Sequence, residues 1–285
     1  MKNWREWPVV IEWNLLIDRI KLHKKKIAIV LICLIIGIIG LDIAGKSVYK
    51  SVYDHKIRQI LGIPNSTISN NIYDKDYSCE NNNSVTSRGY IYIHGYKEHN
   101  IHAFDYERAL LANDTKTKGI LDFDYNETVS TYTLCRIFLG EFNLFVSEHD
   151  FNEIIIFARS AGGNIISYCA KDLIFNGTIE IHTLASPLKG YNVEDKYLSN
   201  RYGIERELGR GYGPYEKPPS NIRVYHHKTV EDESLRSWCG IYDYLCDPVN
   251  IQNNNVPGSQ EFFYPGFNHS SIVQEVSKIV IGCHN

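Results

Sequence analysis

Residues 153–170, EIIIFARSAGGNIISYCA, place a continuous apolar run directly before a segment with helical spacing. A short run rich in isoleucine and without alternation is typical of a strand that is buried on both faces of a parallel sheet. Only a few small residues separate this strand from the helix predicted at 162–174. The stretch therefore restricts the chain to folds in which buried strands and helices alternate.

The same alternation continues along most of the chain after residue 86. Buried strands lie side by side in a parallel sheet when helices cross over between them, so we expect a mostly parallel α/β sheet with helices on both faces. The Gly-, Pro- and Tyr-rich segment 186–220 breaks the pattern and is predicted to be a loop or cap over the carboxyl edge, where such sheets bind ligands. Strands are predicted at 89–95, 119–125, 153–158, 178–185, 221–227 and 260–265, and helices at 104–113, 128–149, 162–174 and 270–282.

The N-terminal region has a different character. Residues 27–41 carry no polar side chain except the thiol of Cys33, and extension to residue 45 gives a length that can cross a bilayer. The basic segment 1–26 precedes this run, which favours a cytoplasmic N-terminus. Asp42 departs from the small-residue pattern of a cleavage site, so we expect an uncleaved transmembrane anchor. A polar linker at 46–86 and a domain at 87–285, outside the cytoplasm, follow from this interpretation.

The charge distribution narrows the class of partner. The 285 residues carry a net charge of −3, of which residues 1–26 contribute +4 and the remainder −7. An acidic main domain argues against nucleic acid as a partner, because nucleic-acid affinity depends on basic residues that neutralise phosphates. The membrane, through residues 27–45, is the partner that the basic tail indicates.

The turn after the strand at 153–158 contains a serine between small residues. Ala158, Ser160 and Gly162 form a small-x-Ser-x-Gly pattern, which predicts a sharp strand-to-helix turn that exposes the Ser160 hydroxyl. The amide of Ala161 would then lie at a helix N-terminus and could donate to a developing oxyanion. A serine that merely caps the helix is the simpler alternative.

Two other segments are compatible with nucleophilic catalysis. His94-Gly95 ends the first predicted strand, and the loop after it could supply a second oxyanion amide from Tyr96. His269 lies between the last strand and the last helix. Because a serine hydroxyl is a weak nucleophile at neutral pH, it needs a nearby base such as His269.

Together with TLASPLKG at 183–190, these motifs resemble the α/β-hydrolase fold, and lipases and esterases within it, over residues 88–285. The resemblance implies a serine hydrolase that cleaves carboxylic esters through a Ser-His-Asp triad and an acyl-enzyme, without a cofactor. Ala158 replaces the first glycine of the usual elbow but remains small. A position next to a bilayer would favour lipid or acylated substrates.

The acid of such a triad should follow the strand at 221–227 and precede His269, and three aspartates do so. CGIYDYLC at 239–246 is similar to the cutinase pattern in which two cysteines flank the catalytic Asp, which implies Asp243 as the acid and a disulfide between Cys239 and Cys246. Asp247 is favoured by the pattern CDPV, and Asp232 is nearest to the strand end. We take Asp243 as the expected acid and leave the other two open.

Two interpretations other than a serine hydrolase are a metal site and an inactive domain. His94, His99 and His102 have a spacing that could suggest a metal, but no carboxylate or cysteine is closely placed with them, so we predict no metal site. The whole domain could instead be a catalytically inactive α/β-hydrolase fold that serves as a membrane-tethered binding or assembly factor, because a fold does not determine an activity.

Overall fold

The computed structural model describes residues 85–98, 104–112, 114–191, 201–230, 232–237 and 248–284. The predicted tail at 1–26, the anchor at 27–45 and all but the last two residues of the linker at 46–86 lie outside these residues. Within the described residues, none of the helices has both the length and the apolar character needed to cross a bilayer.

The centre of the domain is a parallel sheet of six strands in the order β2-β1-β3-β4-β5-β6. The parallel sheet predicted from the sequence is confirmed, and each predicted strand is present within a few residues. The strands are β1 (Arg88–Ile93), β2 (Thr117–Phe123), β3 (Glu153–Arg159), β4 (Thr178–Leu184), β5 (Ile222–Thr229) and β6 (Gln260–Tyr264).

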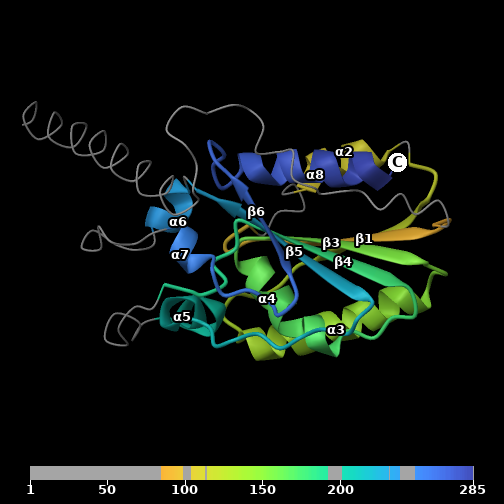
Figure 1. Cartoon of the computed structure of the whole chain (residues 1–285). Helices are drawn as coiled ribbons and strands as arrows, with labels where there is room; N and C mark the ends of the chain where they lie inside the picture. The colour runs from red at the N-terminus through yellow and green to blue at the C-terminus, as the bar shows by residue number, and fades with distance from the viewer. Residues whose placement is uncertain are drawn as a thin grey trace, which may run out of the picture. The chain divides into compact units, whose positions relative to one another are not determined.

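Helices cover both faces of the sheet, as expected (Figure 1). The helices α2 (Asp105–Leu111) and α8 (Ser271–His284) lie on one face, and α3 (Thr131–Ser147) and α4 (Ala161–Cys169) lie on the other. Three short helices lie beyond the ends of the strands, within or after the predicted cap: α5 (Gly203–Arg210), α6 (Glu233–Ser237) and α7 (Pro248–Ile251). A short 3₁₀ turn at Ala170–Asp172 continues α4.

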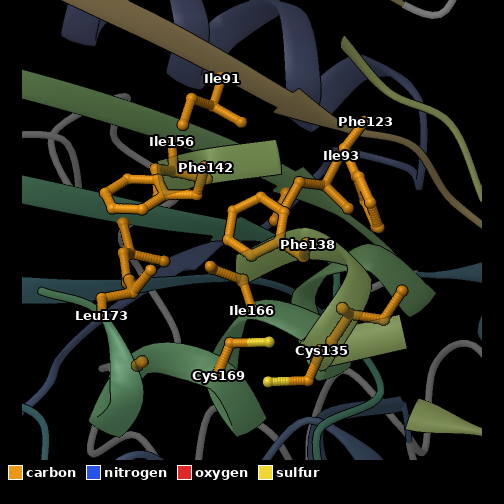
Figure 2. Close-up of a cluster of buried hydrophobic side chains, with 14 of the residues drawn as sticks. Ile91, Ile93, Phe123, Cys135, Phe138, Phe142, Ile156, Ile166, Cys169 and Leu173 are labelled. Atoms are coloured by element: carbon orange, nitrogen blue, oxygen red, sulfur yellow. The ribbon is translucent and has the colours of Figure 1, made fainter. Parts of the chain in front are cut away.

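The face under α3 and α4 is almost wholly apolar. Phe138 and Phe142 of α3 pack with Ile156 and other branched side chains of the sheet, and the thiols of Cys135 and Cys169 close the same cluster (Figure 2). Burial of this much apolar surface stabilises the strand–helix packing without any directional bond. The apolar spacing of the sequence therefore predicts this layer well.

The face under α2 and α8 also has an apolar cluster, but it adds aromatic rings and charged side chains to it. Tyr92, Phe157 and His182 form a stacked row across β1, β3 and β4, with ring centroids 5.8 and 5.4 Å apart. Where the strands begin, Arg88 Nε lies 2.6 Å from Glu153 Oε2, and both side chains are buried. Each strand supplies alternate residues to the two faces, so the two layers differ although they share one sheet.

Two buried glutamates hold the end of α8 against this second face. The ring of His284, the last residue of α8, has Nε2 3.3 Å from Glu180 Oε2 and Nδ1 3.5 Å from Glu153 Oε2. Arg223 approaches the same Glu180 carboxylate at 3.5 Å. We call Arg88, Glu153, Glu180, Arg223 and His284 the amino-edge network. It pairs each buried carboxylate with a basic side chain.

The strand order indicates where along the sheet a ligand is expected to bind. The chain runs from β1 outward to β2 and then returns to β3 on the other side of β1. Ligands bind outside the carboxyl ends of parallel strands at such a reversal, because the two neighbouring loops diverge there. The loops that follow β1 and β3 contain His94-Gly95 and Ser160.

Candidate active site

Ser160 lies in a strained turn between β3 and α4. Its φ of 50° and ψ of −122° fall in a region that a residue with a side chain rarely adopts. The side chain makes no capping hydrogen bond to α4, which excludes the helix-cap alternative. The hydroxyl is therefore available for another role, and the amide of Ala161 opens the first turn of α4, where intrahelical acceptors are absent.

The small residues around Ser160 are required by close contacts. A Cβ added to Gly162 would lie 2.5 Å from the carbonyl oxygen of His94 and 2.6 Å from that of Ile93. Ala158, two residues before the serine, is fully buried and lies opposite Ile93 in the sheet register. The tight turn predicted from the small-x-Ser-x-Gly pattern is confirmed at this level of detail.

The loop after β1 is held by His94. Its ring stacks on Tyr125 with centroids 4.2 Å apart, and Nε2 lies 3.0 Å from Oδ1 of Asp124. Nδ1 lies 2.7 Å from the carbonyl oxygen of Gly95, and the Tyr125 hydroxyl donates to the carbonyl of His94 at 3.1 Å. His94 thus fixes the course of the loop at 94–98. Its predicted companions, His99 and His102, lie outside the described residues.

Tyr96 stands within this loop, beside the cap. Burial and a hydrogen bond with Glu205 of α5 raise the pKa of the Tyr96 phenol. The next residue, Lys97, has a φ of 59°, and its amide donates to a carboxylate oxygen of Glu127. The phenol of Tyr96 is thus joined to the cap helix α5, and the amide that follows it in the chain is joined to Glu127.

His269 pairs with Asp232. Nδ1 of the ring lies 2.7 Å from Oδ2 of the carboxylate, and the two residues are 8% and 0% exposed. A proton on Nδ1 donates to the carboxylate, which leaves Nε2 as the nitrogen that can take up a proton. Within the described residues no hydrogen bond joins His269 to Ser160.

Asp232 is itself held in place on three sides. Its Oδ1 accepts from the amide of Leu235 at 2.8 Å, so it caps α6, and its Oδ2 also accepts from the Thr229 hydroxyl at 2.9 Å. Several hydrogen bonds to one buried carboxylate hold it in one orientation. The pair with His269 therefore has a fixed geometry.

The structure pairs His269 with Asp232, one of the two aspartates left open beside the expected acid Asp243. Nδ1 of His269 has a single proton to donate in the neutral ring, and the structure directs it to Asp232, the candidate nearest to the end of β5. Asp243, Asp247 and the predicted Cys239–Cys246 disulfide lie outside the described residues. Of the described cysteines, Cys135 and Cys169 are free and buried, and Cys283 is disulfide-bonded.

Arg159 links the loops around Ser160 and was not anticipated from the sequence. Its Nη2 donates to Oγ of Ser270 at 2.9 Å, and its Nη1 lies 2.9 Å from Oε1 of Glu98. Since Ser270 follows His269 and Arg159 precedes Ser160, the first bond holds the turn of the serine beside the loop of the histidine. Adjacency to the two residues in the sequence is the signal that could have pointed to Arg159.

Comparisons with solved structures give distant likenesses. The esterase Est1E from Butyrivibrio proteoclasticus is 16% identical, with 70% of this chain and 88% of that chain covered and a TM-score of 0.43. The esterase EaEST from Exiguobacterium antarcticum is 10% identical over 70% and 92%, also with a TM-score of 0.43. The type II thioesterase BorB from the borrelidin biosynthetic cluster is 11% identical over 70% and 92%, with a TM-score of 0.46.

No protein-family model and no curated protein matches the chain. At the identities and TM-scores given above, the likeness carries no weight for the site. The assignment of its residues depends on the strain at Ser160 and on the hydrogen bonds of His269.

Proposed function

We propose that the protein is a serine hydrolase that cleaves carboxylic esters, with Ser160 as nucleophile, His269 as general base and Asp232 as the acid that orients it. The buried pair of His269 and Asp232 carries the proposal, because it lies at the same edge of the sheet as the strained serine and leaves Nε2 free to accept a proton. The unsatisfied first-turn amide of Ala161 supports it.

Acylation is the first half of the proposed reaction. Ser160 Oγ attacks the ester carbonyl while Nε2 of His269 removes the hydroxyl proton, and Asp232 stabilises the imidazolium that forms. The negative charge that develops on the carbonyl oxygen is met by the amides of Ala161 and Tyr96. The tetrahedral intermediate collapses when the imidazolium gives its proton to the departing alkoxide, which leaves an ester on Ser160.

Deacylation uses the same groups in a second cycle. A water molecule replaces the alcohol, and His269 removes one of its protons as the oxygen attacks the acyl carbon. The same two amides stabilise the second oxyanion. Collapse returns the proton to Ser160 Oγ and releases the carboxylic acid, so every proton that His269 takes is returned within one turnover.

The setting of the domain bears on its substrate. We place the enzyme at a membrane through the apolar segment 27–45, with the basic segment 1–26 in the cytoplasm and the catalytic domain outside it. An esterase tethered there would meet acylated or lipid-like esters. Both the anchor and this substrate class are part of the proposal.

A fluorophosphonate probe tests the activity directly, because it phosphonylates only a serine that an adjacent base activates. The full chain is solubilised in detergent, labelled and digested, and the modified peptide is identified by mass spectrometry. We expect a single adduct on the peptide that contains Ser160, absent in Ser160→Ala and His269→Ala. A folded parent that takes up no label would contradict the proposal and favour a catalytically inactive binding or assembly factor.

A further inference from the structure

Arg159 binds two loops at once. The guanidinium of this last residue of β3 contacts Glu98 in the loop after β1 and Ser270 in the loop after β6, each at 2.9 Å. The side chain of Arg159 is 15% exposed and that of Glu98 24%, whereas Ser270 is an exposed residue. A guanidinium presents its donors in a rigid planar fork, and one side chain can therefore hold two acceptors at a set separation.

Glu98 in turn holds the loop at 94–98, called the oxyanion loop here because it contains the proposed oxyanion amide of Tyr96. Its Oε2 accepts from the amide of Gly95 at 2.9 Å, and its own amide donates to the carbonyl of Gly95 at 3.3 Å. The turn that contains Tyr96 is closed at both ends by one residue. A Cβ added to Gly95 would lie 2.8 Å from Oε2 of Glu98 and 3.1 Å from Cβ of Ser160, so the turn lies directly against the nucleophile.

The contact with Ser270 also restrains His269, the proposed base. The hydrogen bond to Asp232 fixes the orientation of the His269 ring but not its distance from Ser160. The bond from Arg159 to Ser270 restrains this distance, because Arg159 is bonded in the chain to Ser160 and Ser270 to His269. Oxyanion loop, nucleophile and base are thus tied together through one side chain.

We propose that Arg159 is a positioning residue which, with Glu98 and Ser270, forms a clamp that sets the distances among the Tyr96 amide, Ser160 Oγ and His269 Nε2. The inference rests on the proposed function, since it concerns the geometry of that site. The two contacts of Arg159 are with Glu98 and Ser270, and the clamp acts on turnover by alignment. A misplacement of about 1 Å in such a site can cost roughly 100-fold in rate.

A purely structural role for Arg159 must be separated from this one. Glu107 of α2 is buried, and its carboxyl pKa is raised by burial and lowered in part by the charge of Arg159. Removal of that charge would also disturb the packing of α2. The decisive substitution is therefore Arg159→Lys, which keeps the charge but replaces the planar fork by a single ammonium.

The test measures kcat and KM on a soluble short-chain ester, per active site titrated with fluorophosphonate, on the full chain. We expect Arg159→Lys to lower kcat by about 10- to 100-fold with KM changed by less than about 3-fold, as for a lost alignment. Ser270→Ala should lower kcat by a smaller factor. The double variant should be no slower than Arg159→Lys, because both substitutions break the same contact.

Arg108→Lys is the matched control. Arg108 of α2 pairs with Asp105 of the same helix and with Asp122 of β2, and its variant should retain parental kinetics. Parental kcat per titrated site in Arg159→Lys, with or without a loss of titratable sites, would overturn the clamp and leave the hydrolase proposal standing. A parent that fails to label would remove the hydrolase proposal, and the clamp with it.

Discussion

Both ends of the parallel sheet bury a histidine against a carboxylate, but among the described residues only the pair at the carboxyl edge shares its edge with a serine of strained backbone. At the carboxyl edge, His269 faces Asp232 beside a serine with a strained backbone. At the amino edge, His284 lies between Glu153 and Glu180, whose charges are balanced by arginines. A histidine–carboxylate pair marks a reactive centre when a free nucleophile accompanies it; without one, it fastens an element of the fold.

The difference predicts a double dissociation between activity and stability. Substitutions at the carboxyl edge should abolish turnover and leave the fold almost unchanged. Substitutions in the amino-edge network should weaken the fold and leave the turnover of each folded molecule unchanged. The following predictions test this separation in order of decreasing effect.

The largest effect is expected for Ser160→Ala. Loss of the nucleophile should lower the rate of ester hydrolysis by about 10⁶-fold. Because the hydroxyl makes no capping bond, the free energy of unfolding in urea should change by less than about 1 kcal/mol. Ser147→Ala, an exposed serine at the end of α3, is the control. A Ser160→Ala protein that unfolds much more easily would show that the serine serves the fold.

The second effect concerns the amino edge. Arg88→Met leaves the buried Glu153 carboxylate without its closest cation and should cost about 3–5 kcal/mol of unfolding free energy. Thermal unfolding should shift down by roughly 10 °C, with the labelling rate per folded molecule unchanged. Arg88→Met combined with Glu153→Met should be more stable than Arg88→Met alone. A stable Arg88→Met protein that no longer labels would break the comparison.

A smaller effect is expected from pH. Although burial alone would raise the pKa of Glu180, hydrogen bonds with His182 and His284 hold it below its ordinary value. A group with a lowered folded-state pKa stabilises the protein above its unfolded value of about 4.3, and this contribution is lost as the pH falls through the folded-state value. Glu180→Gln should therefore lose about 2 kcal/mol at pH 7.

The same variant should show a flatter stability profile in acid. Urea unfolding of parent and Glu180→Gln, measured between pH 7 and the onset of acid unfolding, gives the comparison. The two unfolding free energies should converge as the pH falls below about 4. A constant difference in unfolding free energy over this range would mean that the charge of Glu180 does not stabilise the amino-edge network.

The smallest effect concerns the strain itself. Glycine adopts a φ of 50° without a steric penalty, so Ser160→Gly should relieve the turn. We expect an unfolding free energy about 1 kcal/mol above that of Ser160→Ala, after the entropic cost of the glycine is deducted. Equal stabilities of the two inactive variants would show that the turn stores no strain.

The sequence predicted most of the fold, because buried parallel strands and amphipathic helices leave distinct apolar periods. All six strands appear near their expected positions, and the helix predicted at 270–282 is found at Ser271–His284. The short helices α5, α6 and α7 were missed, since elements of four to eight residues have too few turns to show a period.

The elbow could be predicted from the sequence, whereas the choice of the acid among three aspartates could not be decided from it. The tight turn needs small residues at Ala158 and Gly162, and a requirement on residues so near in the chain can be recognised from the sequence. The choice among three aspartates depends on which carboxylate reaches His269 across the loops after β5 and β6, and that is a tertiary property. Asp232 does carry a local signal, because it stands where a helix cap follows the strand end.

The most direct measurement of the central claim compares two aspartates. The rate constant of fluorophosphonate labelling is determined for the full-length parent, Asp232→Asn and Asp243→Asn under identical conditions. We predict that Asp232→Asn labels about 10⁴-fold more slowly, because His269 loses its orienting carboxylate, while Asp243→Asn labels within about 2-fold of the parent. Parental labelling of Asp232→Asn together with a silent Asp243→Asn would contradict the site described for this sheet edge.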